Sequence, residues 1–353
     1  MKMKKTVCIL LALLLSCTGA LAAAGVFSPN AYYEYLVGSA VWQLSAESQA
    51  MMQQTFAAAK GVLSEMLIKC LDEGEEDWSM TIDENGKARM TYQGKPVAVL
   101  ADIDDTLVDG VHYTCDIGGS DGPVNNAAFA RFVLSDGCTA LPGAVEFVEF
   151  CGSIGVEVFY ITNRYDQGYK VGQSDSAGSY EESIAEEGRG LYIAKDGTEI
   201  GSTTYQVFGK SFFDITLESM TKLGFPIDDQ HLLINDSKLN GNSKEALRTA
   251  VREGCTDHPN GQRTDGNSTG SATTFSCPAH HIALILGDQL NDFSDVFSAE
   301  GVDAVSRAEL TKEYADKWGT EWFLMPNAVY GDAFDYALAY GIPELLKAYS
   351  YVK

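Results

Sequence analysis

Two aspartates, two positions apart, could act together in the segment Asp102-Ile103-Asp104-Asp105-Thr106. The apolar run Val97–Ala101 comes directly before them and is typical of a short buried strand. Carboxylates this close repel one another unless a cation lies between them or they share a proton. The spacing therefore indicates a pocket in which the two carboxylates hold a cation or share a proton. The alternative is an Asp-rich turn that caps a helix at Thr106.

Three further groups of polar residues suit such a site. Thr162-Asn163 offers a hydroxyl and an amide, Lys244 offers a positive charge, and Asp288 with Asp292 offers two more carboxylates. Taken singly, each group has an ordinary structural role as a helix cap, a solvated lysine or a strand-to-turn pair. Together with Asp102 and Asp104, they form a much more specific pattern.

These residues need a scaffold that brings them together, and the surrounding pattern predicts one. Apolar runs lie at Val97–Ala101, Val156–Ile161, His231–Ile234 and Ile282–Leu286, and helical segments separate them at Ala144–Phe150, Thr216–Leu223 and Lys244–Glu253. Buried strands that alternate with helices are typical of an α/β fold with a doubly wound parallel sheet. Because ligands bind at the carboxyl ends of such strands, we expect the polar residues to share one pocket.

The segment before this sheet is expected to be helical. Apolar residues recur at helical spacing over Tyr32–Leu71, and Ser45 provides a helix start. Asp72–Gly94 is polar and carries turn signals, which indicate a short hairpin or a loop. The predicted organisation is a signal peptide at 1–24, an N-terminal helical segment at 25–94 and a core at 95–353, with insertions at about 165–205 and 255–277.

The combined motifs resemble the haloacid dehalogenase (HAD) superfamily, and within it the class C bacterial acid phosphatases. That group is exported, is often lipid-anchored and includes 5′-nucleotidases. The residues that carry the resemblance are Asp102-Ile103-Asp104-Asp105-Thr106-Leu107, Val158-Phe159-Tyr160-Ile161-Thr162-Asn163-Arg164, Gly287-Asp288-Gln289-Leu290-Asn291-Asp292-Phe293, Trp42-Gln43, Pro142-Gly143-Ala144 and Met325-Pro326-Asn327. The likeness runs from about Tyr35 to Asp332. It implies a HAD-like sheet with inserted cap elements.

The resemblance also implies a phosphoryl transfer in two steps. Asp102 would attack phosphorus and form an aspartyl-phosphate, which splits one hard step into two easier ones. Asp104 would protonate the leaving oxygen and then take a proton from water. Thr162 and Lys244 would complete the catalytic set by binding and neutralising the transferred group.

A metal and a substrate contact follow from the same resemblance. Mg²⁺ would be held by Asp102, the backbone carbonyl of Asp104, Asp288 and water, with Asp292 close by. Oxygen ligands of this kind suit Mg²⁺. Asn163 would donate a hydrogen bond to a phosphoryl oxygen.

The sequence departs from the family at two positions of the site. Residue 105 is Asp where the group usually has Glu, and the family's compact lysine block is altered. We select Lys244 as the phosphate-binding lysine because it starts a helix, and Lys238 remains the alternative.

The pocket for the leaving group is less clear in the sequence. Tyr113 follows the first motif and could stack on a nucleobase, as could Trp42 or Phe132, although each is also a normal core residue. The inserted segment after Arg164 could cover the site as part of a cap.

The N-terminus has the pattern of a secretory signal. Met1–Lys5 carries three lysines, and the apolar run Val7–Leu15 follows. Leu14-Leu15-Ser16-Cys17 resembles a lipobox in which Cys17 is lipidated, whereas Ala20-Leu21-Ala22 or Ala22-Ala23-Ala24 would suit ordinary cleavage. We expect an exported protein, either a periplasmic or outer-membrane lipoprotein or a freely secreted one.

Six cysteines remain after such processing, an even number that suggests disulfides in an exported chain. Cys255 and Cys277 bracket a polar excursion and could pin it at its base. Cys115–Cys138 and Cys70–Cys151 would be the remaining pairs, although six cysteines allow many connectivities. A zinc site is less expected because the chain has no CxxC motif and only five histidines.

The net charge of −24 excludes one class of partner. A phosphate backbone would be repelled, so we expect no nucleic acid polymer as a partner. Contact with a membrane is expected only through an anchor at Cys17.

The favoured function is an exported Mg²⁺-dependent acid phosphatase that acts on small phosphomonoesters, with nucleoside monophosphates first. The alternatives are a sugar or other small-molecule phosphatase of the same fold, or a surface-binding lipoprotein without catalysis.

Overall fold

The computed structural model describes residues 40–72, 74–84, 86–113, 129, 132–164, 212–235, 243–263, 271–329 and 331. The predicted signal peptide with Cys17, the insertion at 165–205, Cys115 and Lys238 lie outside these residues. Within them, no helix is both long enough and apolar enough to cross a membrane.

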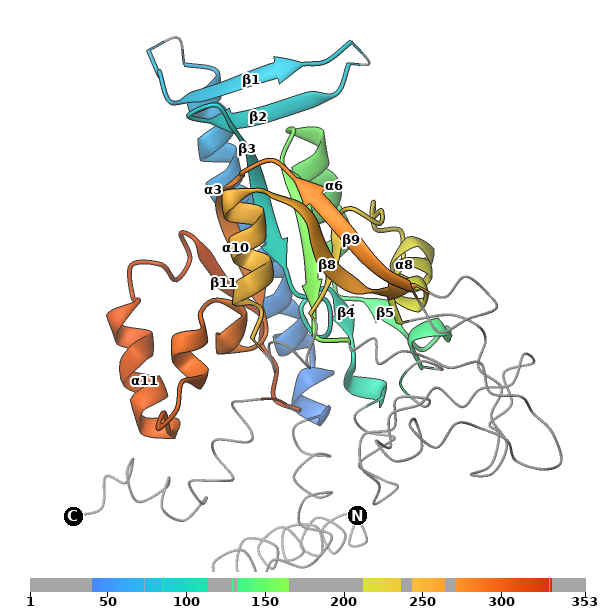
Figure 1. Ribbon diagram of the computed structural model, residues 1–353. Coiled ribbons are helices and arrows are strands. Elements are labelled where there is room, and N and C mark those ends of the chain that lie inside the picture. Colours follow the sequence, from blue (N-terminus) through green and yellow to red (C-terminus); the bar gives the residue numbers. More distant parts are fainter. Residues whose placement is uncertain are drawn as a thin grey trace, which may run out of the picture.

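A parallel sheet forms the centre of the molecule (Figure 1). Its strands lie in the order β7 (Leu232–Ile234), β6 (Glu157–Thr162), β3 (Lys95–Ala101), β10 (His281–Gly287) and β11 (Trp322–Leu324). The predicted α/β class and the first four strands are confirmed. The strand β11 was not predicted, because a three-residue strand is too short to show a period.

An antiparallel hairpin precedes the parallel strands. β1 (Trp78–Ile82) pairs with β2 (Ala88–Tyr92), and β2 pairs with the start of β3. The polar segment, predicted to be a short hairpin or a loop, is therefore a hairpin. This also means that residues 25–94, expected to be a helical segment, contribute strands to the sheet.

Helices cover the sheet. They are α3 (Ala46–Cys70), α6 (Ala144–Ser153), α8 (Phe212–Lys222), α10 (Glu245–Glu253) and α11 (Ala304–Glu313), with single-turn helices η1 (Leu290–Asp292) and η2 (Asp295–Ser298). Four of them, α3, α6, α8 and α10, lie within or overlap the segments predicted to be helical, whereas α11 and the single-turn helices were not predicted. Ser45 caps α3, since its hydroxyl accepts the Ser48 N–H at 3.2 Å, as the sequence predicted. Lys244 occupies the N-cap position of α10.

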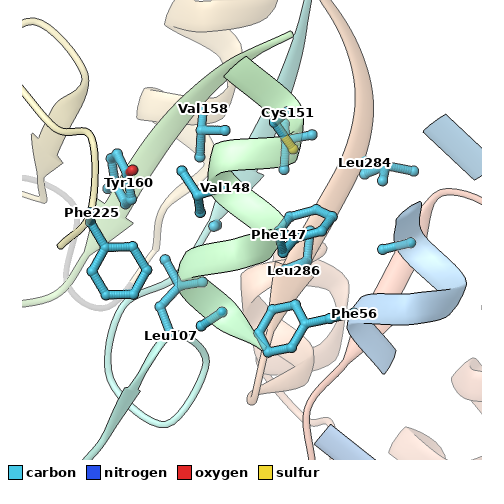
Figure 2. Close-up of a cluster of buried hydrophobic side chains, with 14 of the residues drawn as sticks. Phe56, Leu107, Phe147, Val148, Cys151, Val158, Tyr160, Phe225, Leu284 and Leu286 are labelled. Carbon is cyan, nitrogen blue, oxygen red and sulfur yellow. The ribbon is translucent and has the colours of Figure 1, made fainter. Parts of the chain in front are cut away.

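Alternate residues of β3 face two separate apolar layers, as expected for a strand buried on both sides. Val97, Val99 and Ala101 belong to the cluster that includes α3 and α6. Figure 2 shows part of it, with Phe56 of α3 and Phe147 of α6 close together and ring centroids 5.5 Å apart. Ala98 and Leu100 belong to the opposite cluster, which includes residues of α10.

A second hairpin covers the β7 edge of the parallel sheet. β8 (Cys255–Arg263) and β9 (Ser271–Cys277) pair with each other and lie beside α10 and α8 in Figure 1. The buried Asn260 side chain accepts the Ile234 N–H at 2.8 Å and donates to the Leu232 carbonyl at 2.8 Å. Its amide therefore pairs with the edge of β7 as a neighbouring strand would. The shorter strands β4 (Val108–Asp109) and β5 (Thr139–Ala140) pair with each other after the first motif.

Candidate active site

Three aspartates meet at the carboxyl ends of two adjacent strands. Asp102 follows β3 directly, Asp288 follows β10, and Asp292 ends the single turn η1. The Asp102 N–H donates to the Leu286 carbonyl at 3.0 Å, which aligns the two strand ends. All three side chains are buried, and one carboxylate oxygen from each lies within 4.8 Å of the others. The predicted convergence of the first and fourth strands is therefore present.

Lys244 and Thr106 connect these carboxylates. The Lys244 ammonium forms ion pairs with Asp102 and, at 2.6 Å, with Asp292. The Thr106 hydroxyl lies 3.2 Å from an Asp102 oxygen and 3.3 Å from an Asp288 oxygen. The structure thus brings the selected lysine to the first motif, and Thr106 joins the site where it could have been only a helix cap.

The electrostatics of this group favour a divalent cation. Three carboxylates against one ammonium leave a formal excess of two negative charges in a buried place. Burial raises the pKa of Asp102 well above its usual value despite Lys244, and burial with Asp292 and Asp105 raises the pKa of Asp288 to about 7. Burial opposes the charge on Lys244, but Asp102 and Asp292 outweigh it and raise the lysine pKa. Clustered carboxylate oxygens of this kind fit Mg²⁺.

The Asp288 carboxylate is oriented by two amides. Gln289 Nε2 donates to it at 2.7 Å, and Asn327 Nδ2 donates to the same oxygen at 2.6 Å. Asn327 lies beyond β11, the strand next to β10. The sequence analysis gave neither amide a role. Asn327 stood within a quoted motif, but its partner lies 39 residues away and only the fold brings them together.

Arg164 holds the predicted acid–base residue Asp104. Its guanidinium donates to the two Asp104 oxygens at 2.9 and 2.7 Å, and its side chain is almost completely buried. It also donates to Thr216 on α8 at 3.3 Å. Arg164 stands in one of the motifs of the sequence but was not predicted to have a function. Its position two residues after a buried strand was a usable signal for a place near the site.

Thr162 and Asn163 lie at the carboxyl end of β6, next to β3 in the sheet. Thr162 is buried, and its hydroxyl oxygen accepts the Arg164 N–H at 3.1 Å. Asn163 Oδ1 accepts a hydrogen bond from Asn235 at 2.9 Å. Both residues are on the edge of the sheet predicted for them, and their contacts with a phosphoryl group stay predictions.

Helix α10 is tied to the acidic turn by Arg248, which the sequence analysis did not count among the site residues. Its buried guanidinium donates to the carbonyls of Asn291 and Asp292 at 3.0 and 2.9 Å and to the Asp295 carboxylate at 2.9 Å. Ser243, just before Lys244, also hydrogen-bonds to Asp295. These contacts fix the start of the helix, and with it Lys244, against the turn that carries Asp292.

Asp105, which stands where the family usually has Glu, holds the turn that follows the first motif. It is buried in a left-handed turn with φ of 56°, and one oxygen accepts the Gly110 N–H at 3.0 Å. Asp adopts this conformation more readily than most residues. Burial raises its pKa well above the usual value. A Cβ at Gly110 would lie 2.6 Å from the other Asp105 oxygen, so the turn requires glycine there.

The aromatic residues predicted to bind a base lie in two places. Tyr113 packs against Phe129 and Phe132, with ring centroids 4.9 and 5.8 Å away, and the Arg164 guanidinium lies 5.4 Å from the Phe129 ring. This aromatic group of three rings therefore lies next to Arg164. Trp42 is exposed and does not belong to the group. A separate pocket of about 410 Å³, lined among others by Arg89, contains none of the predicted site residues.

Comparisons with known proteins agree with this geometry. Residues 27–177 match the family described as HAD superfamily, subfamily IIIB (Acid phosphatase). The class C acid phosphatase from Bacillus anthracis with tungstate bound superposes with a TM-score of 0.55 at 18% identity, covering 91% of this chain and 98% of that chain. A second structure of the Bacillus anthracis enzyme gives 0.54 at 18% identity, covering 91% and 92%.

The two kinds of comparison support different statements. The structural likeness shows the fold, a mixed α/β HAD-like class C phosphatase fold with a parallel core sheet and an N-terminal helix. The family match spans the segment that carries Asp102 and Thr162. On this basis residues 27–177 are similar to the acid phosphatases of HAD subfamily IIIB, and the fold is that of the class C acid phosphatases.

Proposed function

We propose that this chain is a Mg²⁺-dependent acid phosphatase that hydrolyses nucleoside monophosphates through an aspartyl-phosphate on Asp102. One observation carries the proposal: the Asp102 carboxylate lies at a strand end beside Lys244, Asp288 and Asp292. A buried carboxylate between an ammonium and a metal-type cluster is suited to attack a phosphoryl group, because positive charge near the site offsets the repulsion between two anions.

In the first step, an Asp102 oxygen forms a bond to phosphorus and the ester oxygen leaves. Asp104 supplies the proton to that oxygen, and Lys244 stabilises the charge on the transferred group. Thr162 and Asn163 donate hydrogen bonds to the phosphoryl oxygens. When bound at the aspartates, Mg²⁺ supplies further positive charge for the phosphoryl oxygens.

In the second step, water attacks the phosphorus of the aspartyl-phosphate and restores Asp102. Asp104, now a carboxylate, takes a proton from that water. The paired contacts from Arg164 support this role, since they fix the orientation of the Asp104 carboxylate. Phosphate then leaves, and the chain returns to its starting state.

Two observations support the choice of substrate. The structure that this fold resembles binds tungstate, a tetrahedral oxyanion like phosphate. The rings of Phe129 and Phe132 lie next to the Arg164–Asp104 pair and are only partly buried, which suits stacking on a planar base.

We further propose that the chain is exported, on the pattern of its first 24 residues, with Cys17 as the lipidated residue. Mass spectrometry of the N-terminus after expression in a bacterium would test this part. A diacylglyceryl group on a chain that starts at Cys17 supports it. A chain starting after Ala22 or Ala24 indicates free secretion instead.

Asp102→Asn tests the chemistry. We expect phosphate release from p-nitrophenyl phosphate, with Mg²⁺ at pH 5–7, to be abolished while the Tm changes little. Asp83→Asn, in the exposed turn between β1 and β2, is the matched control and should keep full activity. Substantial activity in Asp102→Asn would refute the nucleophile.

Initial rates on AMP, NMN and sugar phosphates then test the substrate class. A clear preference for the nucleotides supports the proposal, and a preference for sugar phosphates would replace it. If the wild-type protein releases no phosphate from any ester, the non-catalytic alternative is favoured.

A further inference from the structure

The hairpin β8–β9 begins and ends with a cysteine. Cys255 and Cys277 are direct partners in its antiparallel register, although 22 residues separate them in sequence. Their Sγ atoms lie 3.9 Å apart, and both side chains are partly buried at the edge of the cluster beneath the hairpin. The two residues are thus neighbours in the fold.

This geometry suits a disulfide. Directly opposed residues of antiparallel strands have Cα atoms about 4.5–5.5 Å apart. Disulfides span Cα separations of about 4.4–6.8 Å. Rotation of the side chains is therefore sufficient to bring the sulfurs into bonding distance, and the backbone need not move.

The backbone around the pair is already fixed. A Cβ at Gly254 would lie 2.7 Å from the Ala279 nitrogen, so the chains entering and leaving the hairpin pass in close contact. The His280 N–H donates to the Val251 carbonyl at 3.0 Å and ties the end of α10 to the start of β10. The base of the hairpin therefore holds the thiols opposite each other.

We propose that Cys255 and Cys277 form a structural disulfide that locks the β8–β9 hairpin over the β7 edge of the sheet. The linkage joins the end of α10, the helix that begins beside Lys244, to the segment that enters β10, the strand that ends beside Asp288. It acts on the stability of this face of the molecule and takes no part in phosphoryl transfer. It is therefore independent of the proposed substrate.

The bond forms by exchange with a disulfide-bonded thiol oxidant. One cysteine thiolate attacks a sulfur of the oxidant and expels the first thiolate, which leaves a mixed disulfide. The second cysteine thiolate attacks the protein sulfur of that mixed disulfide and expels the other thiolate. The two cysteines lose two electrons and two protons, and the oxidant becomes two thiols. Burial and the neighbouring Cys255 raise the pKa of Cys277 to about 12, which fits a structural thiol rather than a reactive one.

The linkage is tested on the full chain, equilibrated with oxidised or reduced glutathione and then alkylated. We expect peptide mass spectrometry to find Cys255 joined to Cys277 in the oxidised sample and both alkylated in the reduced one. Two alkylated cysteines after oxidation, or either residue joined to another cysteine, would overturn the proposal.

Thermal unfolding of the same samples measures the effect of the linkage. Oxidation should raise the Tm by about 5 °C, because the crosslink restricts the unfolded chain. The double variant Cys255→Ser/Cys277→Ser should lose this rise and keep its phosphatase activity at 25 °C. Cys255→Ala/Cys277→Ala is the substitute if the serines prevent folding. Cys70→Ser, at the end of α3, is the matched control and should keep the full rise. A rise that persists in the double variant contradicts the proposal.

Discussion

At the scale of single residues, the contacts between Arg164 and Asp104 allow the proposed protonation of the leaving group to be tested apart from the attack on phosphorus. Arg164→Met removes both hydrogen bonds that orient the Asp104 carboxylate. We expect kcat for AMP to fall by about 100-fold, the lower end of what positioned acid–base catalysis contributes. The loss for p-nitrophenyl phosphate should be much smaller, because nitrophenolate leaves without needing a proton.

Steady-state rates on both esters measure this difference, with Arg164→Lys as the comparison that keeps the charge but not the paired contacts. If both esters lose activity equally in Arg164→Met, Arg164 acts on binding or folding and not through Asp104.

Asn327 gives a second prediction at this scale, directed at the metal. Its amide donates to Asp288 at 2.6 Å from beyond β11. Residues that orient metal ligands commonly change metal affinity by about 10–100-fold when they are removed. Asn327→Ala should therefore raise the Mg²⁺ concentration for half-maximal activity by at least about tenfold, with kcat at saturating Mg²⁺ largely preserved. An unchanged Mg²⁺ titration would show that Gln289 alone suffices to orient Asp288.

At the scale of elements, the Asn260 side chain pairs with the backbone of β7 as a neighbouring strand would. It satisfies the Ile234 N–H and the Leu232 carbonyl on the edge of β7. Asn260→Ala leaves both groups buried without these partners, and we expect a loss of about 1–3 kcal/mol in the free energy of unfolding.

Urea unfolding measures this loss, and Asn260→Asp is the matched variant. Asp keeps the acceptor for Ile234 but cannot donate to Leu232, so it should be less stable than the wild type. A stability of Asn260→Ala equal to that of the wild type would mean that the hairpin does not protect this edge.

The sequence predicted the elements that are determined by residues close to one another along the chain. The four apolar runs of the sheet and the cap at Ser45 depend on neighbouring residues, and the structure confirms them. The turn signals before β3 allowed a hairpin or a loop, and the structure has the hairpin. The strand β11 and the roles of Arg164, Asn327 and Arg248 could not be derived in this way. Each depends on a partner far along the chain, or on an element too short to have a period. The ends of predicted strands locate a site, but the contacts that orient its side chains come from the fold.

At the scale of the whole molecule, the end of the sheet opposite the active site carries a titrating cluster. Glu157, at the start of β6, lies 3.6 Å from His231 and 3.2 Å from His280, and His231 also pairs with Asp228 at 2.6 Å. Arg89 of β2 lies 3.8 Å from Glu157. Hydrogen bonds to His231 and His280 lower the pKa of Glu157 from its usual 4.5. Burial opposes the charge on His231, but Glu157 and Asp228 outweigh it and raise its pKa above 6.5.

These shifts have opposite signs and define a window of pH. Stabilisation from Glu157 is present above pH 4.5 and is lost as the pH falls toward its folded-state pKa. Stabilisation from His231 is present below pH 6.5 and is lost as the pH rises through its folded-state pKa. The cluster therefore contributes most between about pH 4.5 and 6.5. A mildly acidic optimum of stability suits the proposed acid phosphatase activity.

Glu157→Gln tests this window, because it removes the charge and keeps the shape. We expect the wild type to exceed the variant in Tm by more at pH 5.5 than at pH 8, because the stabilisation from His231 is fully present only below pH 6.5 and is lost as the pH rises through its folded-state pKa. The measurements need constant ionic strength, because the net charge of −24 makes the chain's self-repulsion depend on salt. A Tm difference that is equal at the two pH values would show that the Glu157–His231 pair does not set the pH dependence, and that the carboxylates elsewhere on this acidic chain do.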